Sequence, residues 1–261
     1  MSHPLVELRS VRKRFGSQVV LDGIDLRLER AEKLVVIGAS GSGKSVLLKH
    51  IVGLLRPDDG EVWYDGRRLD SLTERRLMEV RRRIGFLFQM GALFDSLSVF
   101  DNIAFPVIEH THATRESVRR QVEHKLSLVG LDGIGHKMPA ELSRGQRKRV
   151  ALARAIALEP GLILYDEPTT GLDPVRADVI NELIRKLNRE LRAASIVVTH
   201  DMNSAFKVGD RIVMLYEGRI IADGSPADIR GSTDERVRRF VVGEAGEQDL
   251  QALRGDGLFS A

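Results

Sequence analysis

The sequence of 261 residues contains no cysteine, which excludes disulfides, thiolate metal sites and cysteine nucleophiles. It also lacks any apolar run near the roughly 18 residues that a membrane-spanning helix needs. The first ten residues, MSHPLVELRS, carry no hydrophobic signal region. We therefore expect a soluble, cytoplasmic, globular protein that is not exported.

Neither sign of charge is in large excess, since 40 lysines and arginines face 37 aspartates and glutamates and the formal net charge is +3 at pH 7. The basic runs Arg81–Arg83 and Arg147–Arg149 are scattered and indicate solvated helix faces rather than a phosphate- or lipid-binding stripe. His110 and His112 lack further metal ligands at a suitable spacing and are expected in a polar loop. We expect no nucleic-acid partner.

The pattern of hydrophobic residues predicts an α/β fold. Residues 5–15 and 19–29 alternate as antiparallel strands do, with turns at Gly16 and Gly23, and residues 61–66 indicate an edge strand. Apolar segments predict further strands, separated by stretches with helical periodicity. The predicted strands are 33–38, 84–89, 162–167, 195–200 and 211–224, and the predicted helices include 44–55, 73–83 and 174–191.

The chain shows no internal repeat and is expected to form one domain over residues 1–243. Residues from about 90 to 158 carry mostly helical periodicity, which predicts a helical subdomain nested within it. Residues 244–261 are rich in glycine and polar side chains, and they are expected to form a flexible tail.

The stretch GASGSGKS, residues 38–45, has the spacing G-x-x-x-x-G-K-[ST] between a predicted strand and a predicted helix. In this context backbone N–H groups wrap the phosphates of a nucleotide, and the helix N-terminus adds positive charge. We expect Lys44 to bridge the β- and γ-phosphates and Ser45 to ligate Mg²⁺. The other nucleotide-binding candidates are Gly38, Ser40, Gly41, Gly43 and Val46.

The stretch LILYDE, residues 162–167, delivers two carboxylates to the end of an apolar strand. Asp166 is the candidate for holding Mg²⁺ through water, and Glu167 is the candidate general base for the attacking water. Together with the glycine-rich loop, this strand predicts hydrolysis of a nucleoside triphosphate.

Over about residues 5–243 the sequence resembles the ATP-binding cassette (ABC) ATPases. The resemblance rests on LSRGQRKRVALARAIALEP (142–160), which is similar to the family's signature motif, and on DEPTTGLDP (166–174), VVTHD (197–201) and a glutamine ending a predicted strand. It implies a P-loop NTPase fold with a RecA-like core, an antiparallel β subdomain and a helical subdomain. It also implies a head-to-tail homodimer that uses ATP and Mg²⁺.

The resemblance assigns Ser143, Gly145 and Gln146 of one copy to the γ-phosphate that Lys44 of the other copy binds. Arg144 departs from the family's pattern, which has glycine there, and we expect activity to survive this change.

The resemblance also makes Asp173 the D-loop residue, His200 the switch histidine at the γ-phosphate, and Gln89 the Q-loop ligand of Mg²⁺. Phe15 is the candidate to stack on adenine, with ordinary packing as the alternative.

The stretch GALFDSLSVFDNIAFPVIEHT, residues 91–111, has too many apolar side chains for a solvated loop. In transporters of the resembled family, a helix of the membrane subunit docks in this region. We therefore expect a partner surface, since exposed apolar patches usually mark one. Core packing is the alternative. The candidate residues are Phe94, Leu97, Phe100 and Phe105.

This stretch, the lead MPAELSRG and the later DERVRRF at 234–240 are similar to the ATPase subunits of Mce-associated, Mla-type phospholipid transporters. That similarity implies phospholipid as cargo, a multispanning permease dimer, a periplasmic Mce-domain protein and a STAS-domain regulatory subunit. It places the chain peripherally on the cytoplasmic face of the bacterial inner membrane. The alternatives are a transporter for amino acids or lipoproteins, and a soluble ABC ATPase of iron–sulfur assembly.

Overall fold

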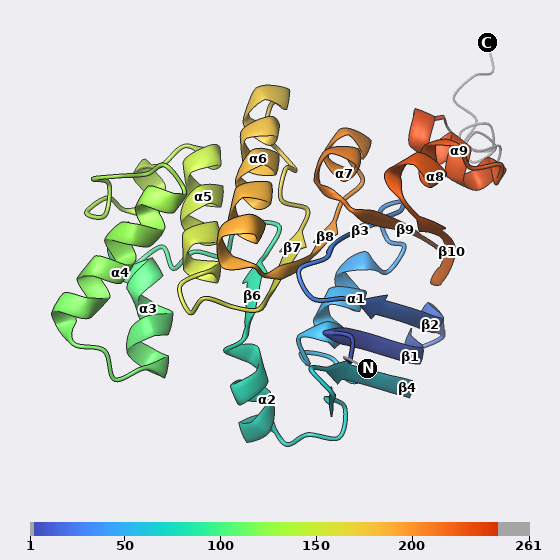
Figure 1. The fold of residues 1–261 in the computed structure, drawn as a ribbon, viewed down its shortest axis with the longest axis horizontal. Helices are drawn as coiled ribbons and strands as arrows, with labels where there is room; N and C mark the ends of the chain where they lie inside the picture. Colours follow the sequence, from blue (N-terminus) through green and yellow to red (C-terminus); the bar gives the residue numbers. More distant parts are fainter. Residues whose placement is uncertain (1–2, 245–261) are drawn as a thin grey trace, which may run out of the picture.

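The computed structural model describes residues 3–244 (Figure 1). The predicted tail at 244–261 lies outside this range apart from its first residue. The strands are β1 (Val6–Phe15), β2 (Gln18–Leu28), β3 (Lys33–Ile37), β4 (Asp59–Tyr64), β5 (Arg67–Arg68), β6 (Ile84–Leu87), β7 (Leu162–Asp166), β8 (Ala194–Val198), β9 (Arg211–Tyr216) and β10 (Arg219–Gly224). The helices are α1 (Lys44–Ile51), α2 (Glu74–Arg81), α3 (Val99–His110), α4 (Arg115–Leu128), α5 (Arg144–Ala155), α6 (Pro174–Leu191), α7 (Met202–Val208), α8 (Pro226–Arg230) and α9 (Glu235–Val242), with a short 3₁₀ helix at Pro139–Glu141.

Six strands form the central sheet, in the order β10-β9-β3-β8-β7-β6. Every pair in it is parallel except β9 with β10. All five residues of β7 and all five of β8 are buried, as expected for parallel strands covered on both faces. Because these strands are parallel, their carboxyl ends lie at one edge of the sheet.

Two hydrophobic cores lie on opposite faces of this sheet. Alternate residues of β3 show the division, since Val35 belongs to one core and Leu34 to the other. The first core includes residues of α3 to α7, and the second includes α1 and the antiparallel sheet. Helix α1 therefore lies between the two sheets (Figure 1).

The antiparallel sheet has the order β2-β1-β4-β5, and it differs from the sequence-based expectation at two places. The predicted turn at Gly23 is wrong, because Gly23 lies within β2, where its φ of +71° coincides with a shift in the register with β1. A bulge accommodates such a glycine without ending the strand. The predicted strand at 61–66 is present as β4, but its predicted position at the edge of a sheet is wrong, since β4 lies between β1 and the short β5.

Helices α3, α4 and α5, which we call the helical group, lie at one side of the molecule, far from the antiparallel sheet in Figure 1. They fall within the predicted helical range, and α6 has the predicted bounds 174–191. Helix α1 is shorter than predicted, because Gly53 adopts a φ of +68° and its N–H bonds back to His50 O. Within residues 3–244 no helix is both long enough and apolar enough to cross a bilayer.

Candidate nucleotide site and docking groove

Four neighbouring strands bring the predicted motifs to one edge of the sheet. Strands β3, β8, β7 and β6 are adjacent and parallel in that order. At these carboxyl ends, or within two residues of them, come the glycine-rich loop, His200, the carboxylate pair and Gln89, respectively. In open α/β sheets ligands bind outside this edge of the strands. Segments far apart in the sequence thus form one candidate site.

The glycine-rich loop has a backbone that only glycines adopt readily. Gly38, Gly41 and Gly43 have φ values of +151°, +80° and +102°. A Cβ at Gly38 would lie 2.2 Å from Leu215 O, whereas a Cβ at Gly41 would meet no atom within 4 Å. The loop is therefore packed on one side and open on the other.

The N-terminus of α1 fits a phosphate group. Its N-cap, Gly43, has no side chain to bond the first N–H groups, and the first turn holds no acidic residue. These N–H groups and the positive end of the helix dipole favour an anion. Ser42 Oγ, within the loop, is buried without a hydrogen-bond partner in the described structure. Of the other candidates, Ser40 is exposed and Val46 is half-buried in α1.

The ammonium of Lys44 bonds to backbone carbonyls of the glycine-rich loop. The side chain is buried, and Nζ donates to Gly38 O at 2.7 Å and Ala39 O at 2.8 Å. Burial lowers the pKa of Lys44 from its ordinary value, while the charges of Glu167 and Asp166 raise it. A partly desolvated cation interacts more strongly with a phosphate than an exposed one does.

Ser45 and Asp166 are 121 residues apart in the sequence and are in direct contact. Ser45 Oγ donates to Asp166 Oδ1 at 2.9 Å. Burial raises the pKa of Asp166, and the bond from Ser45 lowers it again in part. Gln89 is exposed, two residues after the end of β6. A hydroxyl, a carboxylate and an amide offer oxygen donors of the kind that suits Mg²⁺, and of these the structure joins Ser45 and Asp166 directly.

The carboxylate of Glu167 is oriented from both sides. His200 Nδ1 donates to Oε1 at 2.9 Å, and Thr170 Oγ1 donates to Oε2 at 3.0 Å. An ionised carboxylate only accepts, so Nδ1 is the donor in this contact and Nε2 is the ring nitrogen that remains for a ligand. Glu167 is buried and has a φ of +49°, which is uncommon for a residue other than glycine and is typical of functional sites.

The signature and D-loop candidates lie at the starts of two helices. Ser143 caps α5, where Ser143 Oγ accepts from Gln146 N and Gln146 Oε1 accepts from Ser143 N. Asp173 caps α6 and pairs with Arg176 at 3.2 Å, and a Cβ at Gly145 would lie 3.8 Å from Arg176 Cδ. No hydrogen bond within residues 3–244 joins either cap to the glycine-rich loop. Arg144 is exposed in the first turn of α5.

Phe15 ends β1 and is 48% exposed, and Lys13 Nζ lies 5.6 Å from its ring centroid. This ring is not enclosed in a core, and its exposed surface is accessible to a flat ligand.

Lys148 lies at the site although it was not among the predicted site residues. The run Arg147–Arg149 was expected on a solvated face, but Lys148 is buried, and its Nζ donates to Gln89 O and to Glu167 O. Helical spacing is the feature of the sequence that could have indicated the burial of Lys148, because this residue precedes the buried Ala151 and Leu152 by three and four residues. Arg81 was also misjudged, since its guanidinium donates to the carbonyls of Val52 and Gly53.

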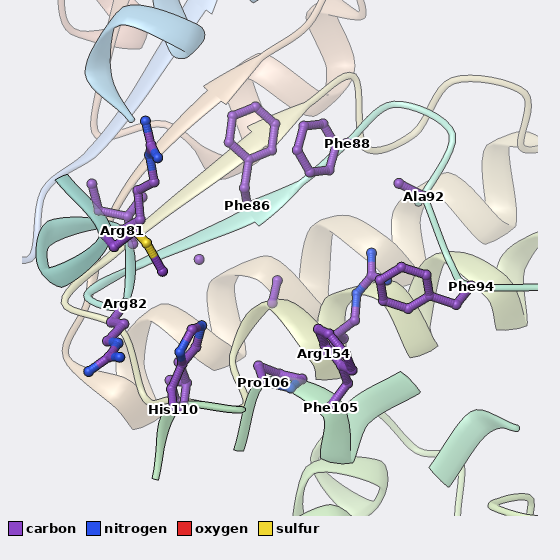
Figure 2. Close-up of a pocket in the computed structure, with 15 residues that line it drawn as sticks. Arg81, Arg82, Phe86, Phe88, Ala92, Phe94, Phe105, Pro106, His110 and Arg154 are labelled. Atoms are coloured by element: carbon purple, nitrogen blue, oxygen red, sulfur yellow. The ribbon is translucent and has the colours of Figure 1, made fainter. Parts of the chain in front are cut away.

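A groove of about 470 Å³ lies beside β6, at the helical group (Figure 2). Phe94 and Phe105, which are 43% and 45% exposed, line it with their ring centroids 5.1 Å apart. Asn102 fixes the loop around Phe94 by accepting from Phe94 N and donating to Phe94 O. The remaining lining residues include Phe86, Phe88, Pro106, Arg81, Arg82, Arg154 and His110. His110 ends α3, so the prediction that it lies in a loop is wrong.

The other two candidates of the partner surface lie elsewhere. Phe100 lines a separate hollow with Leu126 and Gly135, and Leu97 is half-buried outside the groove lining. The predicted surface is therefore divided, with Phe94 and Phe105 at the groove.

Comparisons with known proteins identify relatives over nearly the whole chain. Residues 21–170 match the family described as "ABC transporter". The chain is 43% identical over 245 residues to the "Intermembrane phospholipid transport system ATP-binding protein MlaF" of Haemophilus influenzae, covering 94% of this chain and 93% of that protein. The MlaF of Escherichia coli K12 is 42% identical, with 92% and 90% covered. The "Probable ribonucleotide transport ATP-binding protein mkl" of Mycobacterium tuberculosis H37Rv is also 42% identical, with 91% and 66% covered.

Solved structures resemble the fold closely. A dimeric post-hydrolysis state of the ATP-binding cassette MJ0796 bound to ADP and Pi has a TM-score of 0.79 at 34% identity, covering 85% of this chain and 98% of that one. The cbiO1 protein of Clostridium perfringens, part of the ABC transporter complex cbiONQ, has a TM-score of 0.81 at 28% identity, with 96% and 99% covered.

Proposed function

The chain belongs to the ABC transporter family of ATPases, and from this we propose that it hydrolyses ATP to drive a permease that moves phospholipids between the inner and outer membranes. The observation that carries the choice of cargo is the 42–43% identity to two MlaF proteins, which covers at least nine-tenths of this chain and of theirs. The chain would then be peripheral, on the cytoplasmic face of the bacterial inner membrane.

Each residue of the site has a step to perform. Lys44 and the N-terminus of α1 bind the phosphates, and Phe15 stacks on the adenine. Glu167 takes a proton from the attacking water, and His200 holds the carboxylate in place and contacts the γ-phosphate. Mg²⁺, held by Ser45, Gln89 and, through water, Asp166, would neutralise charge on the β- and γ-phosphates.

The chain acts as a head-to-tail homodimer in this proposal. The capped start of α5 is exposed, so Ser143, Gly145 and Gln146 are accessible to nucleotide bound by a second copy. Asp173 lies beside them at the start of α6. ATP binding would close the dimer and hydrolysis would reopen it. The dimeric post-hydrolysis state of the cassette MJ0796, bound to ADP and Pi, supports the dimer.

The groove would receive a short helix of the permease. Apolar rings line a solvent-open hollow next to the segment that carries Gln89, so a bound helix would contact both the helical group and the nucleotide edge. The Mce-domain protein and the STAS-domain subunit would complete the assembly.

Phe105→Asp is expected to abolish assembly with the permease, because it places a charge among apolar rings that the partner must desolvate. The measurement is the yield of permease that copurifies with the tagged chain. Leu54→Asp is the matched control, since Leu54 is equally exposed but lies outside the groove lining. Equal permease yields from the two variants would contradict the role of the groove.

The test of cargo is affinity purification of the tagged chain from detergent-solubilised membranes, with mass spectrometry of proteins and bound small molecules. We expect a multispanning permease, an Mce-domain protein and phospholipid. The mycobacterial relative named for ribonucleotide transport makes ribonucleotides the second candidate cargo. A different permease with no bound phospholipid would overturn the cargo, and exclusively soluble partners would overturn the transporter role.

A further inference from the structure

Lys148 lies in the first half of α5, the helix whose start carries the signature residues. It is 7% exposed, and its ammonium donates to two backbone carbonyls, those of Gln89 and Glu167, the latter at 3.2 Å. Neither acceptor is a carboxylate. Burial lowers the pKa of Lys148, and the charges of Asp166 and Glu167 raise it again in part. Burying a cation costs free energy, so a lysine beside these two carboxylates points to a role at the nucleotide site.

The contact fixes the backbone of the candidate base. Glu167 N donates to Val198 O at 2.9 Å from the side of β8, and Glu167 O accepts from Lys148 on the side of α5. A residue other than glycine with φ near +49° is strained by about 1–3 kcal/mol and persists only when its surroundings hold it. Lys148 is one of the groups that hold it.

Helix α5 also holds the segment that follows β6. Lys148 donates to Gln89 O, and six residues further along the helix Arg154 Nη2 donates to Gly91 O at 2.9 Å. One helix therefore carries the signature residues at its start and contacts the carbonyls of Gln89 and Glu167. A movement of α5 against the central sheet must either carry both carbonyls or break these bonds.

We propose that Lys148 is a positioning residue for ATP hydrolysis. Its ammonium fixes the backbone of Glu167 relative to the Gln89 segment and the start of α5, so that the base reaches its reactive position only when the helical group is correctly placed. This inference rests on the proposed role of Glu167 as general base.

The test is steady-state ATP hydrolysis by the full chain carrying Lys148→Met, which keeps an unbranched apolar stem one bond shorter than that of lysine and removes the donor. Misplacing a catalytic group by a fraction of an ångström lowers turnover, so kcat is expected to fall about tenfold or more while KM for ATP stays within about twofold. Lys148→Arg, which retains donors, is expected to recover kcat to within about threefold of the original.

Lys125→Met is the matched control. Lys125 is 2% exposed in α4 and pairs with Glu159 at 2.8 Å, outside the nucleotide site. Both methionine variants are expected to lower the melting temperature, but only Lys148→Met is expected to lower kcat. Equal kcat values for the two variants would overturn the proposal, as would a fall in kcat that Lys148→Arg does not reverse.

If Lys148→Met does not fold, Lys148→Leu replaces it, because it also removes the donor and has a compact apolar side chain. Unchanged kcat in that variant would equally overturn the proposal. Glu167→Gln measured in parallel separates the two ideas: retained hydrolysis there removes Glu167 as the base, whatever Lys148 does.

Discussion

Glu167→Gln is expected to lower ATP hydrolysis by about 10²- to 10⁴-fold, the contribution of a positioned general base. Glutamine has nearly the same shape, and its amide oxygen can still accept from Thr170 or His200. It cannot take a proton from water, so the chemical step fails while nucleotide binding persists. The variant should therefore accumulate as an ATP-bound closed dimer.

The measurements are phosphate release and size-exclusion chromatography with ATP. Glu182→Gln is the control, because Glu182 is an exposed residue of α6 outside the site. Turnover of Glu167→Gln close to that of the control would mean that another group is the base.

Lys44→Ala is expected to produce the second largest effect, a loss of nucleotide affinity. A hydrogen bond from a charged group contributes about 1.5–3 kcal/mol, so the Kd for ATP should rise about 10- to 100-fold or more. The buried position of Nζ beside the loop carbonyls makes its charge more effective than that of an exposed lysine.

Isothermal titration with ATP measures this change. Lys49→Ala is the control, since Lys49 is exposed further along the same helix. A Kd for Lys44→Ala within twofold of the control value would contradict the assignment of this loop as the phosphate site.

The nucleotide motifs were predictable because their information is local. GASGSGKS specifies a turn, a helix start and a cation within eight residues, and LILYDE specifies a buried strand with its carboxylates within six. The adjacency of β3, β8, β7 and β6 was not predictable in this way, because strand order depends on contacts between distant segments. Only the family resemblance indicated that His200 and Gln89 belong at the same edge.

The incorrect predictions also have specific physical causes. Gly23 has the conformation of a turn glycine, but the pairing of β1 with β2 holds it in a bulge. Phe100 and Phe105 are five residues apart on α3, which places them about 140° apart around the helix, so they cannot share one surface. Lys148 looked like one member of a basic run, and its burial depends on how α5 packs against the sheet.

The measurement that tests the central claim most directly is transfer of labelled phospholipid by the purified complex of this chain and its permease, reconstituted in vesicles. We expect transfer that requires ATP and is lost when the complex carries Glu167→Gln. Transfer at the same rate without ATP, or ATP-driven movement of a different cargo with no movement of phospholipid, would contradict it.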